Sequence, residues 1–336
     1  MTHPDVPADG GAEDETTGVV VSVVVPSYNY AGYIERAIRS AQEQTFADIE
    51  ILVLDNASTD DSVDRVRALA ADDPRVIIVD REENIGAVPN LIDGHRRTRG
   101  RYSVDLDADD WIVNPRAIER QVEVLDSHPD AAFVFNRVAH YATDGTAMFE
   151  SGAFDSDCVV PGEVALERVT QLVVQHSGTM FRRDAYVRAG GYDARFTVQN
   201  DLKLYVDLCA QGSVAYIDEV LYAWHQHDAN HSRTELFPIM LRELVDVIDA
   251  AYTGPLAGRL DDPSRMRRDA LSHGLLSGPM NAVFAGHTRR AWTEIAAALR
   301  IRPSTALSRH LPIIAARTLL GQRGFTKLEG RLGRSG

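Results

Sequence analysis

Four aspartates fall within six residues of the stretch RYSVDLDADDWIVNP, residues 101–115: Asp105, Asp107, Asp109 and Asp110. Carboxylates this close repel one another, and each raises the pKa of the others unless a cation lies among them. Hard carboxylate oxygens without a neighbouring histidine or thiol suit Mg²⁺ or Mn²⁺, which bind one or two protein carboxylates together with substrate phosphates. The cluster therefore predicts a site for a divalent cation and phosphates, although Asp110 has the alternative of capping a helix in WIVNPRAIERQ.

The elements that must position this cluster are apolar strands separated by helices. The run at residues 19–26, VVVSVVVP, is typical of a strand buried on both faces. Further strands are expected at residues 49–55, 75–80 and 101–107, and amphipathic helices in YIERAIRSAQEQ and SVDRVRALAA. This alternation predicts a doubly wound, mostly parallel α/β sheet, whose ligands bind beyond the carboxyl ends of the strands. The unusual polar residues lie at those ends.

The later part of the chain is less regular. We expect a strand and turn in FVFNRVAHYATDG, a helix in NDLKLYVDLCAQG up to Gly212, and a strand in VAYIDEVLYAWHQH. From about Thr234 the pattern is helical. We therefore divide the chain into a disordered acidic tail (1–17), a catalytic domain (18–233, with halves 18–115 and 116–233) and a helical C-terminal region (234–336).

Composition excludes several classes of function. The net charge of −14 and the pI of about 5.2 argue against nucleic acid as a partner. The two cysteines lack metal-site spacing and suit a reducing compartment. No apolar run approaches the roughly 20 residues of a membrane helix. We therefore expect a cytoplasmic protein.

Four segments together resemble family 2 glycosyltransferases of the GT-A fold, which transfer sugars from nucleotide diphosphates. They are VSVVVPSYNYAGYIERAIRSAQEQTF, EILVLDNASTDDS, ENIGAVPNLIDG and RYSVDLDADDW. The resemblance is strong from about Val21 to Trp111, weaker to about Ser232, and does not cover the C-terminal hundred residues. It implies an inverting transferase that uses Mn²⁺ or Mg²⁺. We expect the transferase to be non-processive, because a processive synthase would need membrane helices and a Gln-x-x-Arg-Trp element, which this sequence lacks.

The resemblance also implies roles for single residues. Four residues after the first strand match the loop around the nucleotide: Pro26, Ser27, Tyr28 and Asn29. Asp55 matches the acid that accepts a hydrogen bond from the base, which favours the N–H of a pyrimidine and therefore a UDP- or dTDP-sugar. Arg81 and Asn84 match the third strand end, near the base and diphosphate, although Arg81 has the alternative of being a surface residue.

Asp107 and Asp109 match the DxD element of the family. The resemblance implies that Asp109 binds the metal and that Asp107 contacts the metal or the ribose. Asp105 stands where relatives usually carry an apolar residue, and an ion pair with Arg101 or with a neighbouring strand is one interpretation.

Asp201 matches the general base, which relatives carry in a Glu-Asp pair. This chain has Asn200 in place of the glutamate, and Asp201 has the alternative of N-capping its helix. His227 matches a histidine that contacts the diphosphate or the metal. His225 replaces the usual arginine, and residues two apart on a strand face the same way. His176 and His225 are candidates for the acceptor side, with the acceptor itself unassigned.

Three alternatives remain open for the basic, amphipathic C-terminal helices: packing back on the catalytic domain, a homo-oligomer contact, or peripheral docking on an anionic membrane. The rival functions are an inactive binding or scaffold protein and a sugar nucleotidyltransferase. The latter needs a glycine-rich loop with a lysine after the first strand, where this chain reads PSYNYAGY.

Overall fold

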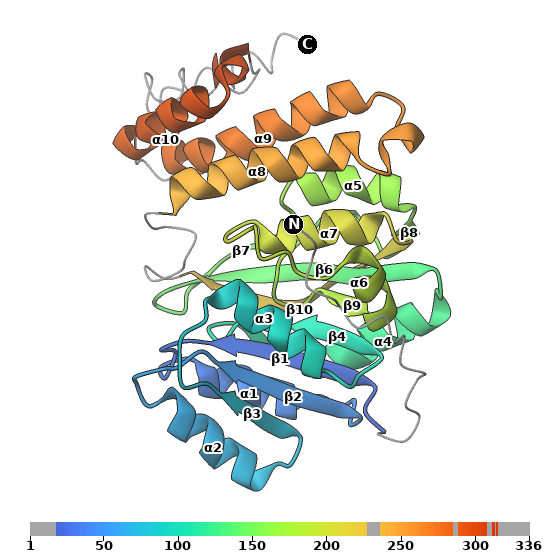
Figure 1. Ribbon diagram of the computed structural model, residues 1–336, viewed down its shortest axis with the longest axis vertical. Coiled ribbons are helices and arrows are strands. Elements are labelled where there is room, and N and C mark those ends of the chain that lie inside the picture. Colours follow the sequence, from blue (N-terminus) through green and yellow to red (C-terminus); the bar gives the residue numbers. More distant parts are fainter. Residues whose placement is uncertain (1–17, 227–235, 285–287, 308–310, 313, 315–336) are drawn as a thin grey trace.

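The computed structural model describes residues 18–226, 236–284, 288–307, 311, 312 and 314. The predicted acidic tail and His227 lie outside these residues. The described part is one mixed sheet covered by helices, with further helices stacked beyond one end (Figure 1). Among these residues, no helix is long and apolar enough to cross a membrane.

Ten strands form the sheet, in the order β3-β2-β1-β4-β9-β6-β10-β5, with β7 beside β6 and β8 beside β10. Their bounds are β1 Val21–Ser27, β2 Ile49–Asp55, β3 Val76–Asp80, β4 Tyr102–Asp105, β5 Trp111–Ile112, β6 Ala131–Ala142, β7 Ala147–Ser151, β8 Cys158–Val160, β9 Met180–Arg182 and β10 Ser213–Gln226. β1 pairs in parallel with β2 and β4, and β6 with β10, while β9 is antiparallel to both β4 and β6. The carboxyl ends of β1, β2, β4, β6 and β10 therefore meet at one edge.

Helices connect and cover these strands. Their bounds are α1 Ile34–Gln42, α2 Ser62–Asp72, α3 Ala87–Arg97, α4 Ala117–Ser127, α5 Gly162–Thr170, α6 Arg183–Ala189, α7 Asn200–Cys209, α8 Phe237–Thr253, α9 Pro263–Phe284 and α10 Thr288–Ile301, with 3₁₀ turns at Ala257–Arg259 and Pro303–Leu307. The four expected strands of the first half and the helices between them are confirmed within a few residues. The strand at 101–107 is shorter than expected, since β4 ends at Asp105.

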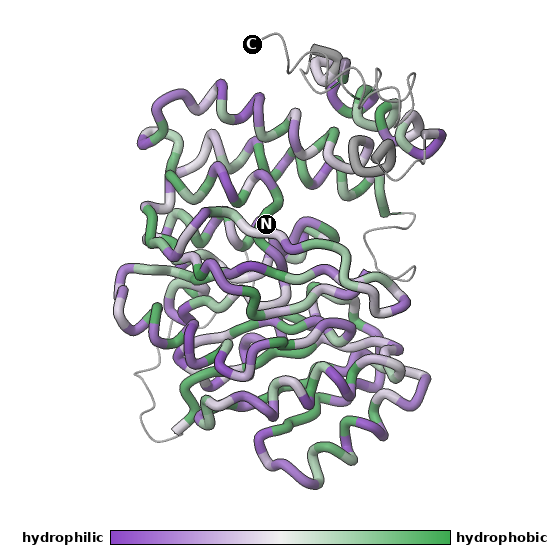
Figure 2. The backbone as a smooth tube through the Cα atoms, turned by 180° about the vertical axis from the view of Figure 1, so that it is seen from behind, coloured by the Kyte–Doolittle hydropathy of each residue, from purple (hydrophilic) through white to green (hydrophobic). Residues whose placement is uncertain are grey.

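The core lies on both faces of the sheet, because strands such as β1 are apolar throughout. Val21, Val23 and Val25 face one hydrophobic cluster and Val24 faces the other. Helix α3 can pack closely on β2 because residue 94 is glycine: a Cβ there would lie 2.1 Å from the Leu54 side chain. Figure 2 shows hydrophobic stretches running through the central strands and alternating with hydrophilic ones along the outer helices.

The C-terminal helices pack on the rest of the chain. Helices α5 and α7 lie beside the sheet, α8 and α9 cover them, and α10 lies on α9 (Figure 1). Leu244 and Val247 of α8 share a core with Leu202 of α7. The predicted apolar stripe of α10 faces inward, since Ala291, Ile295 and Ala298 are buried. Of the three alternatives, these helices therefore pack back on the rest of the chain. A homo-oligomer contact and docking on a membrane stay predictions.

Candidate active site

The loops after β1 and β2 form one side of the site and are joined to each other by hydrogen bonds. The Asn29 backbone N–H donates to Ser58 Oγ at 2.9 Å, and Asn29 Oδ1 accepts the Thr59 N–H at 2.8 Å. Asn29 has a φ of 58°, a left-handed conformation that asparagine tolerates better than most residues. These bonds fix the loop formed by Pro26, Ser27 and Tyr28, in which Tyr28 is 42% exposed.

Asp55, at the end of β2, is buried at 1% exposure. Its Oδ1 accepts the Ser58 hydroxyl at 2.6 Å, and its Oδ2 accepts the Ser58 backbone N–H at 2.8 Å. The Asp55 side chain thus closes an Asx-type turn. Asp55 therefore orders the turn itself, and its bond to a nucleotide base stays a prediction.

Arg81 and Asn84 contact polar groups of their own half of the chain. Arg81 Nε donates to Asn90 Oδ1 at 2.6 Å, and its guanidinium pairs with Asp93, so it lies against α3. Asn84 Oδ1 accepts an N–H of the Asn56 side chain at 3.0 Å. Arg81 thus stabilises the helix after β3, and Asn84 joins the loop after β3 to the loop after β2. Contact of either side chain with the base and diphosphate stays a prediction.

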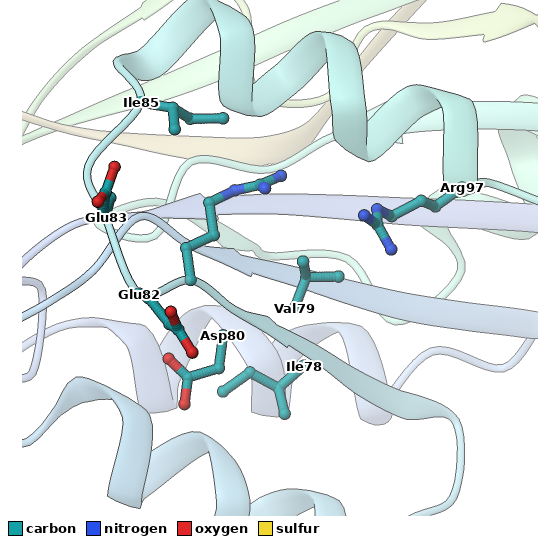
Figure 3. A pocket seen from close by; sticks show the side chains of 8 residues that line it. Ile78, Val79, Asp80, Glu82, Glu83, Ile85 and Arg97 are labelled. Carbon is teal, nitrogen blue, oxygen red and sulfur yellow. The ribbon is translucent and has the colours of Figure 1, made fainter.

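A hollow of about 570 Å³ lies outside β3, lined by residues 78–83, Ile85 and Arg97. Its acidic side chains come from the end of β3 and the loop after it, and Arg97 from α3 (Figure 3). Arg81 is the one predicted site residue among its lining residues. The candidate site is therefore not built around this hollow.

Asp105 has a defined role, which differs from the expected ion pair with Arg101 or with a neighbouring strand. Its Oδ1 accepts His95 Nε2–H at 2.9 Å, and its Oδ2 accepts the Tyr192 hydroxyl at 2.7 Å. Arg101 instead pairs with Asp126. Burial by itself would raise the pKa of Asp105, but the His95 and His176 imidazoles lower that pKa below its usual value. The carboxylate thus fastens β4 to α3 and to the segment before α7.

His176 connects Asp107 to Tyr192 and Asp105. Its Nδ1 lies 3.0 Å from Asp107 Oδ1, and its Nε2 lies 3.0 Å from the Tyr192 hydroxyl. Burial would lower the pKa of His176, but the Asp107 and Asp105 carboxylates outweigh it and raise the pKa to about 10. Both ring nitrogens therefore carry protons, and the hydrogen bonds run in one direction, from His176 through Tyr192 to Asp105.

Asp109 and Asp110 lie in the turn after β4. Arg36 donates to the Asp109 backbone carbonyl at 3.2 Å and stacks over the Trp111 ring at 3.6 Å. Asp110 is buried, accepts the His225 backbone N–H at 2.8 Å and accepts the Ser177 hydroxyl. The alternative that Asp110 caps the following helix is wrong, because α4 begins at Ala117 after Arg116.

The turn carrying His176 and Ser177 depends on Gly178. This residue has a φ of 93°, and a Cβ there would lie 2.4 Å from the Tyr222 ring. Its backbone N–H donates to the Asp105 carbonyl at 3.0 Å. Glycine thus allows the turn to lie against β4, where Ser177 Oγ accepts the Asp107 N–H at 3.0 Å.

Asp201 is the second residue of α7 and not its N-cap, so the capping alternative is wrong. The N-cap is Gln199, and Asp201 Oδ1 accepts the N–H of Leu202 at 2.7 Å. Burial raises the pKa of the Asp201 carboxyl above its ordinary value, partly offset by the positive charge of His176. Because His176 also interacts with Asp107, the structure brings Asp201 and the aspartate cluster to one place.

His225 is buried against aromatic rings. Its ring is edge-on to Tyr33 at 5.3 Å and to Trp111 at 6.3 Å, and only 5% of the residue is exposed. The expected partnership with His227 falls outside the described residues. A direct role of His225 toward metal or acceptor stays a prediction.

The acidic residues fit a divalent cation in their chemistry. Burial raises the pKa of Asp110, and so does the negative charge of Asp107 and Asp109. Burial also raises the pKa of the Tyr30 phenol, and the negative charges of Asp109 and Asp107 raise it further. The negative charges of these carboxylates therefore act on one another and on Tyr30. No group of three or more histidine, cysteine or acidic residues surrounds a metal position in the described part of the chain, so a cation here would need ligands from a phosphate or from water.

Sequence reasoning missed several residues that contact the predicted ones: Arg36, His95, Ser177 and Tyr192. Ser177 lies next to a histidine that was identified, and its neighbour Gly178 was the available signal. Arg36 lies on α1 and His95 on α3, and the sequence patterns of these helices did not indicate a functional residue. Asp109, the partner of Arg36, is 73 residues away along the chain. Asp105, the partner of His95, is only 10 residues away, but in a different element, so no helical or strand spacing marks the pair.

The family model described as Glycosyl transferase family 2 matches residues 22–190. Chondroitin synthase of Escherichia coli is 27% identical over 218 residues, which are 65% of this chain and 30% of that protein. The putative teichuronic acid biosynthesis glycosyltransferase TuaG of Bacillus subtilis is 35% identical over 129 residues, 38% of this chain and 50% of that one. The chain spans less than a third of the length of the chondroitin and hyaluronan synthases that it matches.

Solved structures share the fold. S. aureus TarS 1–349 in complex with UDP-GlcNAc superposes with a TM-score of 0.58 at 14% identity, covering 86% of this chain and 92% of that one. The mannosyltransferase PcManGT from Pyrobaculum calidifontis, in complex with GDP-Man and Mn²⁺, gives a TM-score of 0.55 at 21% identity, covering 93% and 90%. Identities this low establish similarity of architecture alone.

Proposed function

Since the chain belongs to glycosyl transferase family 2 and has the GT-A fold, we propose that it is an inverting, non-processive, metal-dependent glycosyltransferase. The donor is a UDP- or dTDP-sugar, and the acceptor supplies a hydroxyl group. The observation that carries this proposal is the meeting of Asp107, His176 and Asp201 at the carboxyl edge of the sheet. An inactive binding protein and a nucleotidyltransferase have no observation in their favour.

The loops after β1 and β2 bind the nucleotide in this proposal. Asn29 and Ser58 hold the two loops together, and Asp55 accepts an N–H from the base with a lone pair that its turn leaves available. Tyr28 is exposed and offers an aromatic face to the base. Neighbours of similar fold bind UDP-GlcNAc and GDP-Man, which supports a nucleotide-sugar donor.

Asp109 and Asp107 hold Mn²⁺ or Mg²⁺ together with the donor diphosphate. When bound, the ion neutralises the charge that develops on the departing diphosphate, so no protein acid has to protonate it. His176 donates a hydrogen bond to Asp107 and keeps that carboxylate oriented. Arg36 holds the Asp109 backbone in place.

Asp201 removes the proton from the acceptor hydroxyl. The acceptor oxygen forms a bond to the anomeric carbon while the bond from that carbon to the diphosphate oxygen breaks. A single displacement of this kind inverts the configuration. The raised pKa of Asp201 suits a general base, which is most effective when its pKa lies near the working pH.

Calorimetry of UDP, dTDP and GDP binding, with and without Mn²⁺, tests this function. We expect UDP or dTDP to bind more tightly than GDP and Mn²⁺ to strengthen the binding. Asp109→Ala should remove the effect of Mn²⁺, whereas Glu83→Gln, a change at an exposed acid after β3, should not. UDP binding that is equally tight in EDTA would contradict the metal requirement.

A further inference from the structure

Glu243 is a buried acidic residue in the C-terminal helical region, on α8, with 8% of its surface exposed. Its carboxylate accepts three consecutive backbone N–H groups. Oε1 accepts that of Thr197 at 2.7 Å, and Oε2 accepts those of Val198 and Gln199 at 2.8 and 2.9 Å. A buried carboxylate is stable only when its oxygens are bonded in this way.

These three N–H groups belong to the bend that leads directly into α7. Gln199 is the N-cap of α7, and Asp201 follows two residues later. The negative charge of Glu243 therefore lies at the N-terminal end of this helix, where the helix dipole favours it. Three bonds to consecutive residues fix both the position and the direction in which α7 begins.

The sequence around α7 does not supply this anchoring. Gln199 makes no side-chain capping bond, and Asp201 bonds to its own neighbour Leu202. Asn200 Nδ2 donates to the Thr197 carbonyl at 3.3 Å and so leaves the N–H groups to another acceptor. That acceptor comes from α8, whose Leu244 and Val247 pack in the same core as Leu202.

We propose that Glu243 is the positioning residue for Asp201, and that α8 is in this way part of the catalytic machinery. The inference rests on the proposed role of Asp201 as the base. It assigns a function to a residue beyond the 22–190 range of the family match. When Glu243 loses its charge, the bend at 197–199 relaxes and the carboxylate of Asp201 moves from the acceptor hydroxyl. A displacement of about 1 Å costs on the order of 100-fold in rate.

Glu243→Gln and Glu243→Ala test the proposal with two measurements. Hydrogen–deuterium exchange should show the amides of residues 197–199 exchanging at least about tenfold faster in both variants. UDP release from UDP-glucose, UDP-galactose and UDP-N-acetylglucosamine, with Mn²⁺ and with water as acceptor, should fall about 10-fold for Glu243→Gln and about 100-fold for Glu243→Ala. UDP binding by calorimetry should stay within about twofold of the wild-type value. The reason is that the loops after β1 and β2, which bind the nucleotide in the proposed function, are separate from the bend at 197–199.

Asp249→Asn is the matched control. Asp249 is also an acid of α8, but it pairs with Arg267 of α9 at 2.6 Å. This variant should lose thermal stability and keep both amide protection at 197–199 and UDP release. Equal losses of UDP release in Asp249→Asn and Glu243→Gln would overturn the proposal, since they would reflect general destabilisation.

The outcomes separate this inference from the proposed function. Unchanged exchange at 197–199 in Glu243→Gln overturns the anchoring whatever the reaction is. Wild-type UDP release in Glu243→Gln together with an inactive Asp201→Asn overturns the positioning role and leaves Asp201 as the base. Wild-type release in Asp201→Asn overturns both. Non-additive losses in the double variant, with no further effect of Glu243→Gln once Asp201 is changed, support the proposal.

Discussion

The loops after β1 and β2 and the cluster around Asp107 and Asp201 are stabilised by different kinds of contact, although both lie at one edge of the sheet. In the loops after β1 and β2, hydrogen-bonded partners are 2 to 32 residues apart. In the cluster they are 69 residues apart for Asp107 and His176, and 115 for Asp110 and His225. The first region is therefore ordered by two neighbouring connections, and the second depends on contacts between residues far apart in the chain.

This difference implies that binding and chemistry are separable. A change in the remote partners of the cluster should alter transfer and metal binding while leaving the nucleotide loops intact. A change within the loops should do the reverse. Both statements rest on the proposed function, and four variants or conditions test them.

The largest expected effect is that of Asp201→Asn. Loss of a general base typically costs 10²–10⁴-fold, so UDP release from a UDP-sugar should fall by roughly that factor. UDP binding by calorimetry should not change. Asp207→Asn is the control, since Asp207 lies on the same helix and pairs with Lys203. Transfer at the wild-type rate in Asp201→Asn would show that another group takes the proton.

The pH dependence should follow the carboxyl of Asp201. Burial raises its pKa above the ordinary value, and the base acts only when it is deprotonated. The rate should therefore rise with pH through this pKa and fall about tenfold per unit below it, at a higher pH than for an ordinary aspartate. UDP binding measured in parallel corrects for losses in the donor site. An acid limb that persists unchanged in the residual activity of Asp201→Asn would assign it to another group.

Ser177→Ala tests the remote contacts. The hydroxyl donates to Asp110 and accepts the Asp107 N–H at 3.0 Å, and the residue is buried. Leaving these groups unpaired should lower the free energy of unfolding by about 1–3 kcal/mol, measured by denaturant titration. The gain in UDP binding on adding Mn²⁺ should shrink, while binding in EDTA should not. An unchanged Mn²⁺ effect would separate this serine from the metal site.

Ser58→Ala is the counterpart within the loops and should have the smallest effect. It removes the hydroxyl bond to Asp55 at 2.6 Å and the acceptor for the Asn29 N–H. The side chain is only half-buried, so the loss of stability should be about 0.5–1.5 kcal/mol. UDP binding in EDTA should weaken, and the added effect of Mn²⁺ should persist. A loss confined to the Mn²⁺ effect would contradict the proposed separation of the two regions.

The regular first half was predictable because its signals are local. A continuous apolar run such as β1 has few alternatives to a strand buried on both faces, and turn residues such as Asn29 and Ser58 act within one connection. The family resemblance added the order of the segments, and the strand ends then indicated where the polar residues meet. The fold was thus determined by the sequence itself, which also indicated the edge of the sheet at which we propose the site.

The tertiary structure decided what each charged group does. Asp105 reads as a misplaced acid in a strand, and only the packing of α3 and Tyr192 against it shows a satisfied buried carboxylate. Glu243 is one of several charged residues in the sequence of α8, and only the packing of α8 on α7 brings it to the backbone before Asp201. Side-chain partners distant along the chain leave no periodic trace in the sequence, because burial and hydrogen bonding depend on which elements meet in space.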